Sequence, residues 1–225
     1  MNSEAARLAD LLSKSQTNLC QELKSMLHEF DLKYYNEFAC VCGVDEAGRG
    51  PLAGDVYAAA VVFDKDTVID EVNDSKKLTE KKREQLFDVI CEKAKDFCIA
   101  TASVEEIEEL NILGAAMLAM KRAVEGLECK PDIALVDGNR KPALDCQTQT
   151  VVKGDASSQS IAAASILAKV ARDRYMLEVA KQYPQYQFEK HKGYGTKLHY
   201  EMLDKYGISD VHRPSFLKKY LAGKK

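Results

Sequence analysis

Apolar residues recur at helical spacing through the first 37 residues of the chain. Separated by polar residues, these apolar positions are Leu8, Leu11, Leu12, Leu19, Leu23, Met26, Leu27 and Phe30. Spacings of three and four residues place side chains on one face of a helix, which then covers apolar surface elsewhere. We therefore expect residues 1–37 to form a helical N-terminal extension and residues 38–225 to form one larger domain.

Short β-rich runs follow, and the first two, at residues 39–45 and 56–63, flank a segment dense in glycine. This arrangement is typical of an antiparallel strand pair joined by a long structured loop. Three further runs, at residues 97–104, 132–138 and 148–155, are also strand candidates. The run at 132–138 is apolar and ends in Asp-Gly, which is typical of a buried strand.

Helical spacing returns between and after these runs. We expect helices at residues 78–95, 105–110, 112–127, 156–182 and 197–206, with a final short one in the tail. Thr79, near the start of the first of these segments, and Asp155, directly before the fourth, are residue types that cap helix N-termini. Strands first, and then alternating strands and helices, predict an α/β or α+β domain with a mixed sheet.

Composition adds limits to this picture. A chain of 225 residues with 46% hydrophobic and 30% charged content fits one globular domain, although its length would also allow two small ones. No apolar run approaches the roughly 20 residues that a membrane span needs. Acids interrupt the apolar residues of the N-terminus, so it lacks the pattern of a signal peptide. We expect a cytoplasmic protein with no membrane partner.

The seven cysteines are better explained as reduced core thiols than as metal ligands. Their number is odd, and the chain is too large to depend on disulfides. Cys40 and Cys42 form the one close pair, and on a strand they would share a face. No histidine lies near them in sequence to complete a zinc site.

The net charge of −3 and the pI of about 5.9 argue weakly against a nucleic-acid partner. Phosphate binding, however, needs only a local basic patch. Residues 190–225 are rich in Lys, Arg and His and interleaved with tyrosines, although the same residues could form a solvated surface. Our candidates for a phosphate-binding surface are Lys76, Lys153, Lys169, Lys192 and Arg213.

Acidic residues at the ends of apolar segments carry the candidate chemistry. Asp45 and Glu46 end the first strand run, Asp137 ends the fourth, and Asp173 lies within the long helix. Carboxylate oxygens are the ligands that Mg²⁺ and Mn²⁺ prefer, and two such ions can act together on a phosphodiester. Adjacent residues of a regular strand face opposite sides, so the strand is expected to end or bend at Asp45-Glu46. Taken alone, Asp137-Gly138 could equally be a turn.

The long helix offers further polar groups on one side. Ser158, Ser165 and Arg172 recur every seven residues, and Lys169 lies four residues before Asp173. The alternative interpretation is a solvated face on which Lys169 and Asp173 form an ion pair. Because Lys153-Gly154-Asp155 precedes it, the N-terminus of this helix is also a candidate phosphate site.

Several motifs follow one another between about residues 41 and 216: DEAGRGPLAG, DSKKL, VDG, KGDASSQSIAAASILAKVARDR, KGYGT and HRPSF. Together they resemble ribonuclease HII. DEAGRG and SIAAASILAKVARDR are highly specific, whereas VDG alone would mean nothing. The resemblance implies a ribonuclease H-like fold, in which helices flank a mixed five-stranded sheet and the C-terminal region is helical.

The resemblance also implies an activity. Members of this family hydrolyse the RNA strand of RNA–DNA hybrids. They also cut the phosphodiester on the 5′ side of a single ribonucleotide embedded in duplex DNA, leaving 3′-hydroxyl and 5′-phosphate ends. This reaction belongs to ribonucleotide excision repair and uses Mg²⁺ or Mn²⁺, with two ions during catalysis. The partners implied are the RNA–DNA hybrid and DNA duplex containing ribonucleotides, bound by a monomer.

Family roles transfer to particular positions. The four catalytic acids, expected to bind metal, are Asp45, Glu46, Asp137 and Asp173, of which the first three are the family's usual ligands. Gly48-Arg49-Gly50 matches the tripeptide whose backbone senses the ribose 2′-hydroxyl, the group that distinguishes RNA from DNA. Tyr194 matches the tyrosine that packs on the next sugar. The further substrate contacts that we expect are Ser75, Lys76, Lys153, Ser165 and Lys169.

The chain departs from the family pattern after LAG, where the family commonly has Pro-Val and this chain has Asp55 and Val56, followed by Tyr57. We expect altered local packing there. Ribonuclease HIII, which cuts long hybrids, remains the main alternative, but its N-terminal domain is larger and contains a sheet. A silent nucleic-acid-binding module would not need the four acids. A phosphatase with an aspartyl nucleophile would need Asp-x-Asp after its first strand.

Overall fold

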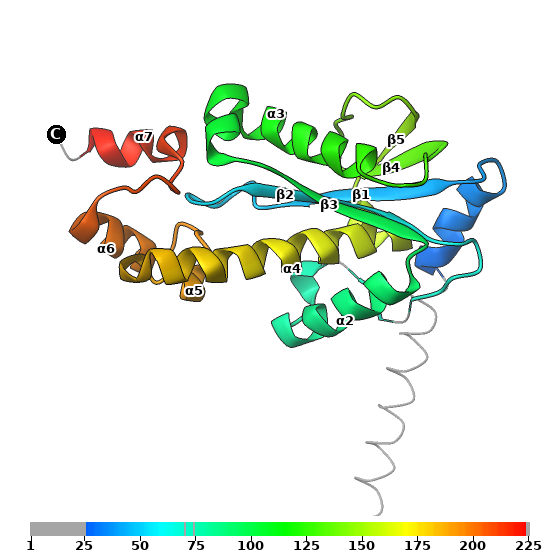
Figure 1. Ribbon diagram of the computed structural model, residues 1–225, viewed down its shortest axis with the longest axis horizontal. Helices are drawn as coiled ribbons and strands as arrows, with labels where there is room; N and C mark the ends of the chain where they lie inside the picture. Colours follow the sequence, from blue (N-terminus) through cyan, green and yellow to red (C-terminus); the bar gives the residue numbers. More distant parts are fainter. Residues whose placement is uncertain (1–25, 70, 74, 224–225) are drawn as a thin grey trace, which may run out of the picture.

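A computed structural model describes residues 26–69, 71–73 and 75–223, and Figure 1 shows its layers. The centre is a five-stranded sheet in the order β3-β2-β1-β4-β5. The strands are β1 Val41–Ala47, β2 Val56–Val62, β3 Asp96–Ala102, β4 Ile133–Asp137 and β5 Gln147–Val151. The mixed five-stranded sheet expected from the sequence is therefore confirmed.

The strands of the sheet pair in both directions. An eight-residue segment between β1 and β2 reverses the chain, and these strands pair antiparallel, as β2 and β3 do. Parallel pairing of β1 with β4 and of β4 with β5 completes the sheet. Because β1 and β4 are parallel, their carboxyl ends meet at one edge, where Asp45, Glu46 and Asp137 stand.

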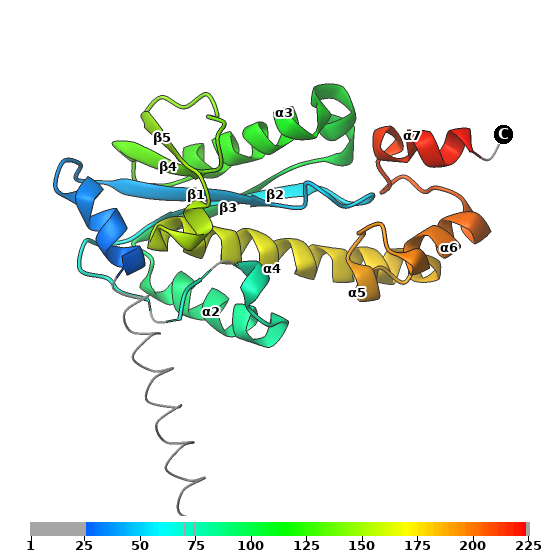
Figure 2. The same cartoon turned by 180° about the vertical axis from the view of Figure 1, so that it is seen from behind.

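Helices cover both faces of the sheet. The helices are α2 Glu80–Lys93, α3 Val104–Glu125, α4 Gln159–Gln182, α5 Phe188–His191, α6 Lys197–Tyr206 and α7 Pro214–Ala222. In Figures 1 and 2, α3 lies on one face and α4 with α2 on the other. Short 3₁₀ turns occupy Ser75–Lys77, Gly154–Ala156 and Pro184–Tyr186. None of the helices in the described ranges is long and apolar enough to cross a membrane.

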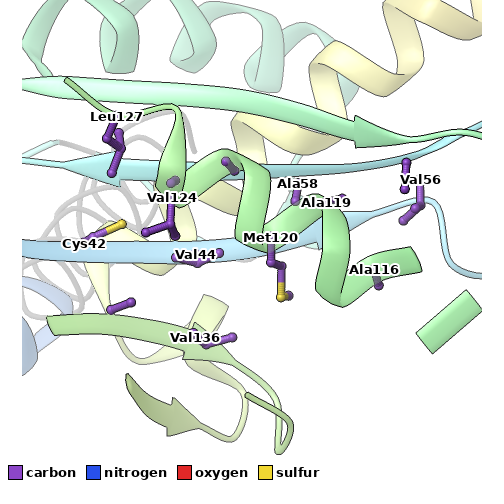
Figure 3. Packing of buried hydrophobic residues seen from close by; sticks show 14 of the residues in the cluster. Cys42, Val44, Val56, Ala58, Ala116, Ala119, Met120, Val124, Leu127 and Val136 are labelled. Carbon is purple, nitrogen blue, oxygen red and sulfur yellow. The ribbon is translucent and has the colours of Figure 1, made fainter. Parts of the chain in front are cut away.

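Two apolar layers hold the helices on the sheet. Under α3, the side chains of Val44, Val136 and Met120 belong to one buried cluster, which Figure 3 shows. On the other face, α4 lies directly against β1. A Cβ added to Gly43 would come within 2.2 Å of the Ser160 carbonyl carbon, so only glycine permits this approach. The long helix is thereby fixed against the strand that carries the first two acids.

The long helix begins later than expected, and the predicted cap is wrong. Asp155 lies in the 3₁₀ turn Gly154–Ala156, and Ser158 is the N-cap of α4, where its hydroxyl accepts a hydrogen bond from Ile161 N. Lys153, before the turn, takes a left-handed conformation with φ 57°. This turn lies between the end of β5 and the helix, so the chain cannot enter α4 directly from Asp155.

Two helices were expected at 105–110 and 112–127, and α3 is a single element with a break at the residue between them. Asn111 has φ 61° and ψ 168°, outside the helical region, and its side chain accepts hydrogen bonds from Leu113 N and Gly114 N. It therefore caps the second half of the helix. Thr79 caps α2 as expected, by accepting from Lys82 N.

The C-terminal region forms a separate apolar cluster at one end of the molecule, where Figure 2 shows α5, α6 and α7. The short α5 was not expected. At the other end of the chain, residues 26–35 are helical, and residues 1–25, which include most of the predicted extension, lie outside the described residues. The division into residues 1–37 and 38–225 therefore stays a prediction.

Candidate active site

The first strand runs through both of its acids, so the expectation that it ends or bends there is wrong. The antiparallel ladder with β2 continues through Glu46 and Ala47, whereas the parallel ladder with β4 ends at Val44 opposite Val136. Beyond that pair, β1 has no partner on the β4 side. Asp45 is buried and Glu46 half-buried at this open edge, and Asp137 ends the neighbouring strand.

The chain itself holds each of these carboxylates. Asp45 Oδ1 accepts a hydrogen bond from Glu46 N at 2.7 Å, and Asp137 Oδ1 accepts one from Gly154 N at 2.7 Å. Arg49 Nη1 donates to Glu46 Oε1 at 3.0 Å. The turn before α4 therefore anchors one acid, and the loop after β1 anchors another. Glu46, Asp137 and Arg49 also line a cavity of about 270 Å³.

At this edge, burial and the charges of neighbouring acids raise the pKa of Asp45 and of Glu46. The pKa of Asp45 is raised well above its usual value, first by burial and then by the charges of Glu46 and Asp137. Burial also raises the pKa of Glu46, with a further contribution from Asp137, while Arg49 and Lys76 oppose the shift. Mutual repulsion among buried carboxylates is relieved by a bound cation.

The chemistry of these donors fits a hard divalent cation. All three offer carboxylate oxygen, the ligand type of Mg²⁺ and Mn²⁺. Within the described residues, no three His, Cys, Asp or Glu side chains already lie close enough together to hold a metal ion. Asp45, Glu46 and Asp137 would therefore turn from their hydrogen-bond partners in the chain toward the ion.

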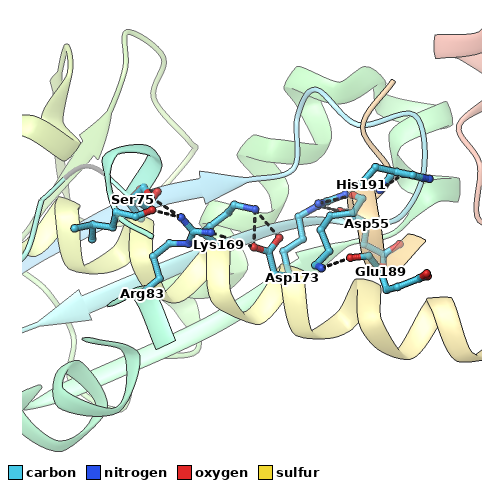
Figure 4. A network of polar contacts seen from close by, with 12 residues as sticks. Asp55, Ser75, Arg83, Lys169, Asp173, Glu189 and His191 are labelled. Carbon is cyan, nitrogen blue, oxygen red and sulfur yellow. Dashed lines mark hydrogen bonds and ion pairs between the residues drawn. The ribbon is translucent and has the colours of Figure 1, made fainter. Parts of the chain in front are cut away.

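Asp173 has different surroundings, drawn in Figure 4. Lys169 Nζ lies 2.5 and 2.7 Å from its two carboxylate oxygens, and Arg83 Nη2 lies 3.8 Å from one of them. The ion pair between Lys169 and Asp173, which the sequence left as an alternative, is present. Burial lowers the pKa of Lys169, and Asp173 opposes that shift. Asp173 is thus balanced by cations, whereas the other three acids repel one another.

The two serines expected to contact substrate lie beneath the site. Ser75 and Ser165 are both buried, with 2.8 Å between their hydroxyl oxygens, and Ser165 also hydrogen-bonds to the Asp45 carboxylate. They connect the 3₁₀ turn at Ser75–Lys77 to the sheet edge that carries Asp45. Lys76 and Lys153 are exposed, and Lys76 Nζ lies 3.5 Å from Asp155 Oδ2.

The glycine-rich loop after β1 brings its tripeptide next to Tyr194. Gly48 has φ 99°, and a Cβ there would lie 2.2 Å from Arg172 Nε, so two independent reasons require glycine. A Cβ on Gly50 would lie 3.8 Å from the Tyr194 ring. That ring is 41% exposed, with Lys169 Nζ 5.9 Å from its centroid. The exposure expected for a tyrosine between two glycines is confirmed.

The expected basic surface needs a correction at Arg213. Its side chain is completely buried and donates to backbone carbonyls, so it cannot contact a phosphate from the surface. His191, His199 and His212 are buried in the same region. The sequence suggested a basic surface because residues 190–225 are rich in Lys, Arg and His. In the fold, however, these three imidazole rings and the Arg213 guanidinium point into the interior.

Sequence reasoning also missed Arg83, which lies between two parts of the site. Its Nη1 donates to Ser75 O at 3.0 Å and to Leu78 O at 2.6 Å, while Nη2 faces Asp173. Nothing in the charged run of α2 distinguishes this arginine from its neighbours.

At the departures from the family pattern, Asp55 accepts a hydrogen bond from Val104 N, and the Tyr57 ring packs on Tyr175.

Known proteins resemble this chain in sequence and in fold. A family model described as Ribonuclease HII matches residues 42–219. The Ribonuclease HII of Caldicellulosiruptor bescii is 54% identical over 195 residues, covering 86% of this chain and 95% of the relative. That of Clostridioides difficile is 51% identical over 217 residues, covering 95% and 85%. The solved ribonuclease H2 from Pyrococcus horikoshii OT3 has a TM-score of 0.67 at 27% identity, covering 80% of this chain and 96% of that chain.

Proposed function

The chain belongs to the ribonuclease HII family, and from that premise we propose that it cuts duplex DNA on the 5′ side of an embedded ribonucleotide. As a family member it is a ribonuclease H enzyme, and its broader proposed substrate is the RNA strand of an RNA–DNA hybrid. The observation that carries the proposal is that Asp45, Glu46 and Asp137 lie at one sheet edge beside the glycine-rich loop, near enough for two of the charges to raise the pKa of Asp45.

We assign the cation site to Asp45, Glu46 and Asp137, with Asp173 as the fourth acid beside it. The ion would be Mg²⁺ or Mn²⁺, and two ions would bind during catalysis. When bound, they would supply Lewis acidity and lower the pKa of a water molecule at the phosphodiester. The chain contributes orientation. Gly154 N holds Asp137, and Ser165 holds Asp45, so each carboxylate starts from a defined position.

Lys169 and Arg83 give Asp173 a separate role. Both cations contact its carboxylate, and both lie near the edge that a phosphate would approach. A phosphate arriving there adds negative charge and competes with Asp173 for Lys169. We propose that Lys169 moves part of its contact from Asp173 to the substrate, which leaves the carboxylate of Asp173 able to turn toward the site.

Recognition of the ribonucleotide is assigned to the loop and the exposed ring. Gly48, Arg49 and Gly50 offer backbone that a sugar can approach closely, because two of the three residues have no side chain. Tyr194 stands next to Gly50 and offers an aromatic face to the adjoining sugar. Lys76 and Lys153 are proposed phosphate contacts. Ser75 and Ser165, which are buried, are proposed to act by orienting Asp45.

One comparison of substrates tests the proposal. Three labelled duplexes are incubated with the full chain and Mg²⁺ or Mn²⁺: all-DNA, DNA with one ribonucleotide, and a long RNA–DNA hybrid. We expect cleavage of the last two, with the single-ribonucleotide duplex cut at the 5′ side of the ribonucleotide. Cleavage of the long hybrid alone would favour the ribonuclease HIII type of specificity. No cleavage of either substrate would contradict the proposal. Because one chain carries the four acids and the loop, we further propose that the monomer is active.

A further inference from the structure

Arg213 occupies an unusual position for a cation. Its guanidinium is completely buried, and none of the hydrogen bonds it makes goes to a carboxylate. Burial lowers its pKa to about 9, so the side chain remains cationic at neutral pH. Burying a charge without an opposite charge destabilises a fold unless polar groups surround it. Arg213 is surrounded by backbone carbonyls.

All of these carbonyls belong to the loop between β1 and β2. Nη2 donates to Gly48 O at 2.8 Å, Nη1 to Arg49 O at 3.3 Å and to Pro51 O at 2.8 Å. Nε and Nη2 both donate to Gly54 O, at 2.8 and 2.5 Å. A planar guanidinium has five N–H donors in fixed directions, and here each is used on one loop.

A second buried guanidinium completes the support of this loop. Arg172, on α4, donates to Ala53 O and Asp55 O at 3.1 and 3.2 Å, and to Lys192 O at 3.1 Å. Backbone pairing adds two further connections, Arg213 N to Leu52 O and Gly54 N to Val211 O. The loop is thus attached to the C-terminal region, more than 150 residues away along the chain.

The direction of the carbonyls determines the direction of the amides. In a trans peptide the C=O of one residue and the N–H of the next point in opposite directions. With Gly48 O and Arg49 O turned inward onto Arg213, the N–H groups of Arg49 and Gly50 point away from it. Both residues are exposed, and within the described part of the chain these two N–H groups have no acceptor.

We propose that Arg213 is a positioning residue for ribonucleotide recognition: by holding the carbonyls of Gly48 and Arg49 inward, it presents the N–H groups of Arg49 and Gly50 to the ribose 2′-oxygen. The inference rests on the proposed function, because it explains how the same loop distinguishes RNA from DNA. Arg213 touches no substrate. A hydroxyl oxygen can accept from both amides, whereas a deoxyribose offers no acceptor at that position.

The test compares Arg213→Lys with a matched control. Lysine keeps the charge but has no planar fork, so it cannot hold the four carbonyls together. Leu203→Ala is the control, because Leu203 is buried in the same C-terminal cluster and its apolar side chain has no donor for these carbonyls. For each protein, KM and kcat are measured on the single-ribonucleotide duplex, and the inhibition constant of an all-DNA duplex is measured under the same conditions with Mg²⁺.

In Arg213→Lys we expect KM for the ribonucleotide duplex to rise about tenfold, which corresponds to about 1.4 kcal/mol. The inhibition constant of all-DNA duplex should stay unchanged, since phosphate contacts do not involve this loop. Leu203→Ala should leave the ratio of this inhibition constant to KM unchanged, even if its melting temperature falls further than that of Arg213→Lys. Equal losses on both duplexes, or an unchanged ratio in Arg213→Lys, would overturn the positioning role.

Two other outcomes are decisive as well. Should Arg213→Lys not fold, Arg213→Gln replaces it, because the planar amide can still bond some of the carbonyls. Failure of both variants to fold would assign Arg213 to the fold and overturn the inference. If the unaltered protein itself does not cut the single-ribonucleotide duplex, the proposed function fails first. That result is distinct from a variant that cuts without losing discrimination.

Discussion

Asp45 combines three effects that disfavour an ionised carboxylate: burial, the charge of Glu46 and the charge of Asp137. The folded state therefore holds its proton more tightly than the unfolded chain does. The stability that Asp45 contributes is fully present below the unfolded pKa, about 3.8, and is lost as the pH rises through the raised folded value. At neutral pH this residue destabilises the protein, as expected where a site is shaped for function.

This electrostatic penalty leads to a prediction for Asp45→Asn. Removing one charge relieves the repulsion, so without divalent metal the melting temperature should rise, by about 2–4 °C for each 1 kcal/mol. Cleavage with Mg²⁺ should fall at least about 100-fold, because a ligand and its charge are lost. Thermal unfolding in a chelator and single-turnover cleavage measure the two effects on one protein.

Asp132→Asn is the control, since the Asp132 carboxylate accepts from Cys40 N ahead of β1 and lies away from the acids of the site. It should keep cleavage and gain no stability. If Asp45→Asn were less stable than the unaltered protein and still cleaved at its rate, Asp45 would be a structural residue and the assignment would be wrong.

Tyr194 separates recognition from metal binding. The residue is 41% exposed, a Cβ on Gly50 would lie 3.8 Å from its ring, and a phenol ring is no usual ligand of Mg²⁺. Tyr194→Ala should lose about tenfold or more of the cleavage at a single ribonucleotide, through lost stacking. Tyr194→Phe, which keeps the ring, should retain most of it. Metal titration should give the same affinity for all three proteins. Unchanged cleavage in Tyr194→Ala would rule out the role in sugar recognition.

Among the elements, the N-terminal helix makes contacts that bear on stability more than on chemistry. Asp31 Oδ2 accepts a hydrogen bond from Ser160 N in the first turn of α4. Phe30, Tyr34 and Tyr35 pack on a cluster that includes Ile161. The helix therefore packs on inner strands of the sheet and caps α4, away from the carboxylates that would bind metal.

Deletion of residues 1–37 should accordingly lower the melting temperature and leave the cut position and the metal requirement unchanged. We propose on this basis that residues 38–225 form the catalytic domain. Circular dichroism, thermal unfolding and product mapping on the truncated chain measure each effect. Within the full chain, Asp31→Ala should be less stable than Asp31→Asn, whose amide oxygen can still accept from Ser160 N. A truncated protein that folds and binds duplex but cannot cut would contradict this division.

The same elements show what the sequence could and could not reveal. Helix α6 matches its predicted span because Thr196 caps it and its apolar spacing is local information. The cap of α4 was wrong because Asp155 and Ser158 are both good caps, and only the preceding turn decides between them. The expected end or bend of β1 at Asp45-Glu46 was wrong, because the ladder with β2 continues to Ala47 and only the ladder with β4 ends at Val44. That depends on the partner strand.

At the scale of the whole molecule, the overall charge and the local surface point in different directions. The net charge is −3, yet Lys76 and Lys153 are exposed and Lys192 is half-buried, and Lys76 lies close enough to Glu46 to lower the pKa of that carboxyl. Arg213 and three histidines, counted from the sequence as basic surface, are buried. Burial depends on long-range packing, so sequence reasoning identified the motif around Arg213 but assigned its side chain to the wrong place.

Duplex binding should nevertheless depend on salt. Log affinity should fall linearly with log salt concentration, and each phosphate contact should contribute about −0.9 to the slope. Lys153→Ala should make the slope shallower by about one contact. Lys95→Ala should leave it unchanged, because Lys95 precedes β3 and its Nζ faces Asp64. Fluorescence anisotropy with an all-DNA duplex gives the slopes. A slope near zero for the unaltered protein would remove the phosphate-contact model.

We propose above that this chain uses its carboxylate site to cut beside one ribonucleotide in duplex DNA. The most direct measurement maps the ends produced from such a duplex by the unaltered protein and by Asp137→Asn, with Mg²⁺ and with a chelator. We predict one cut, 5′ of the ribonucleotide, leaving 3′-hydroxyl and 5′-phosphate ends. It should require the metal and be reduced at least about 100-fold in folded Asp137→Asn. A cut elsewhere, a cut in the chelator, or full activity in that variant would contradict the account.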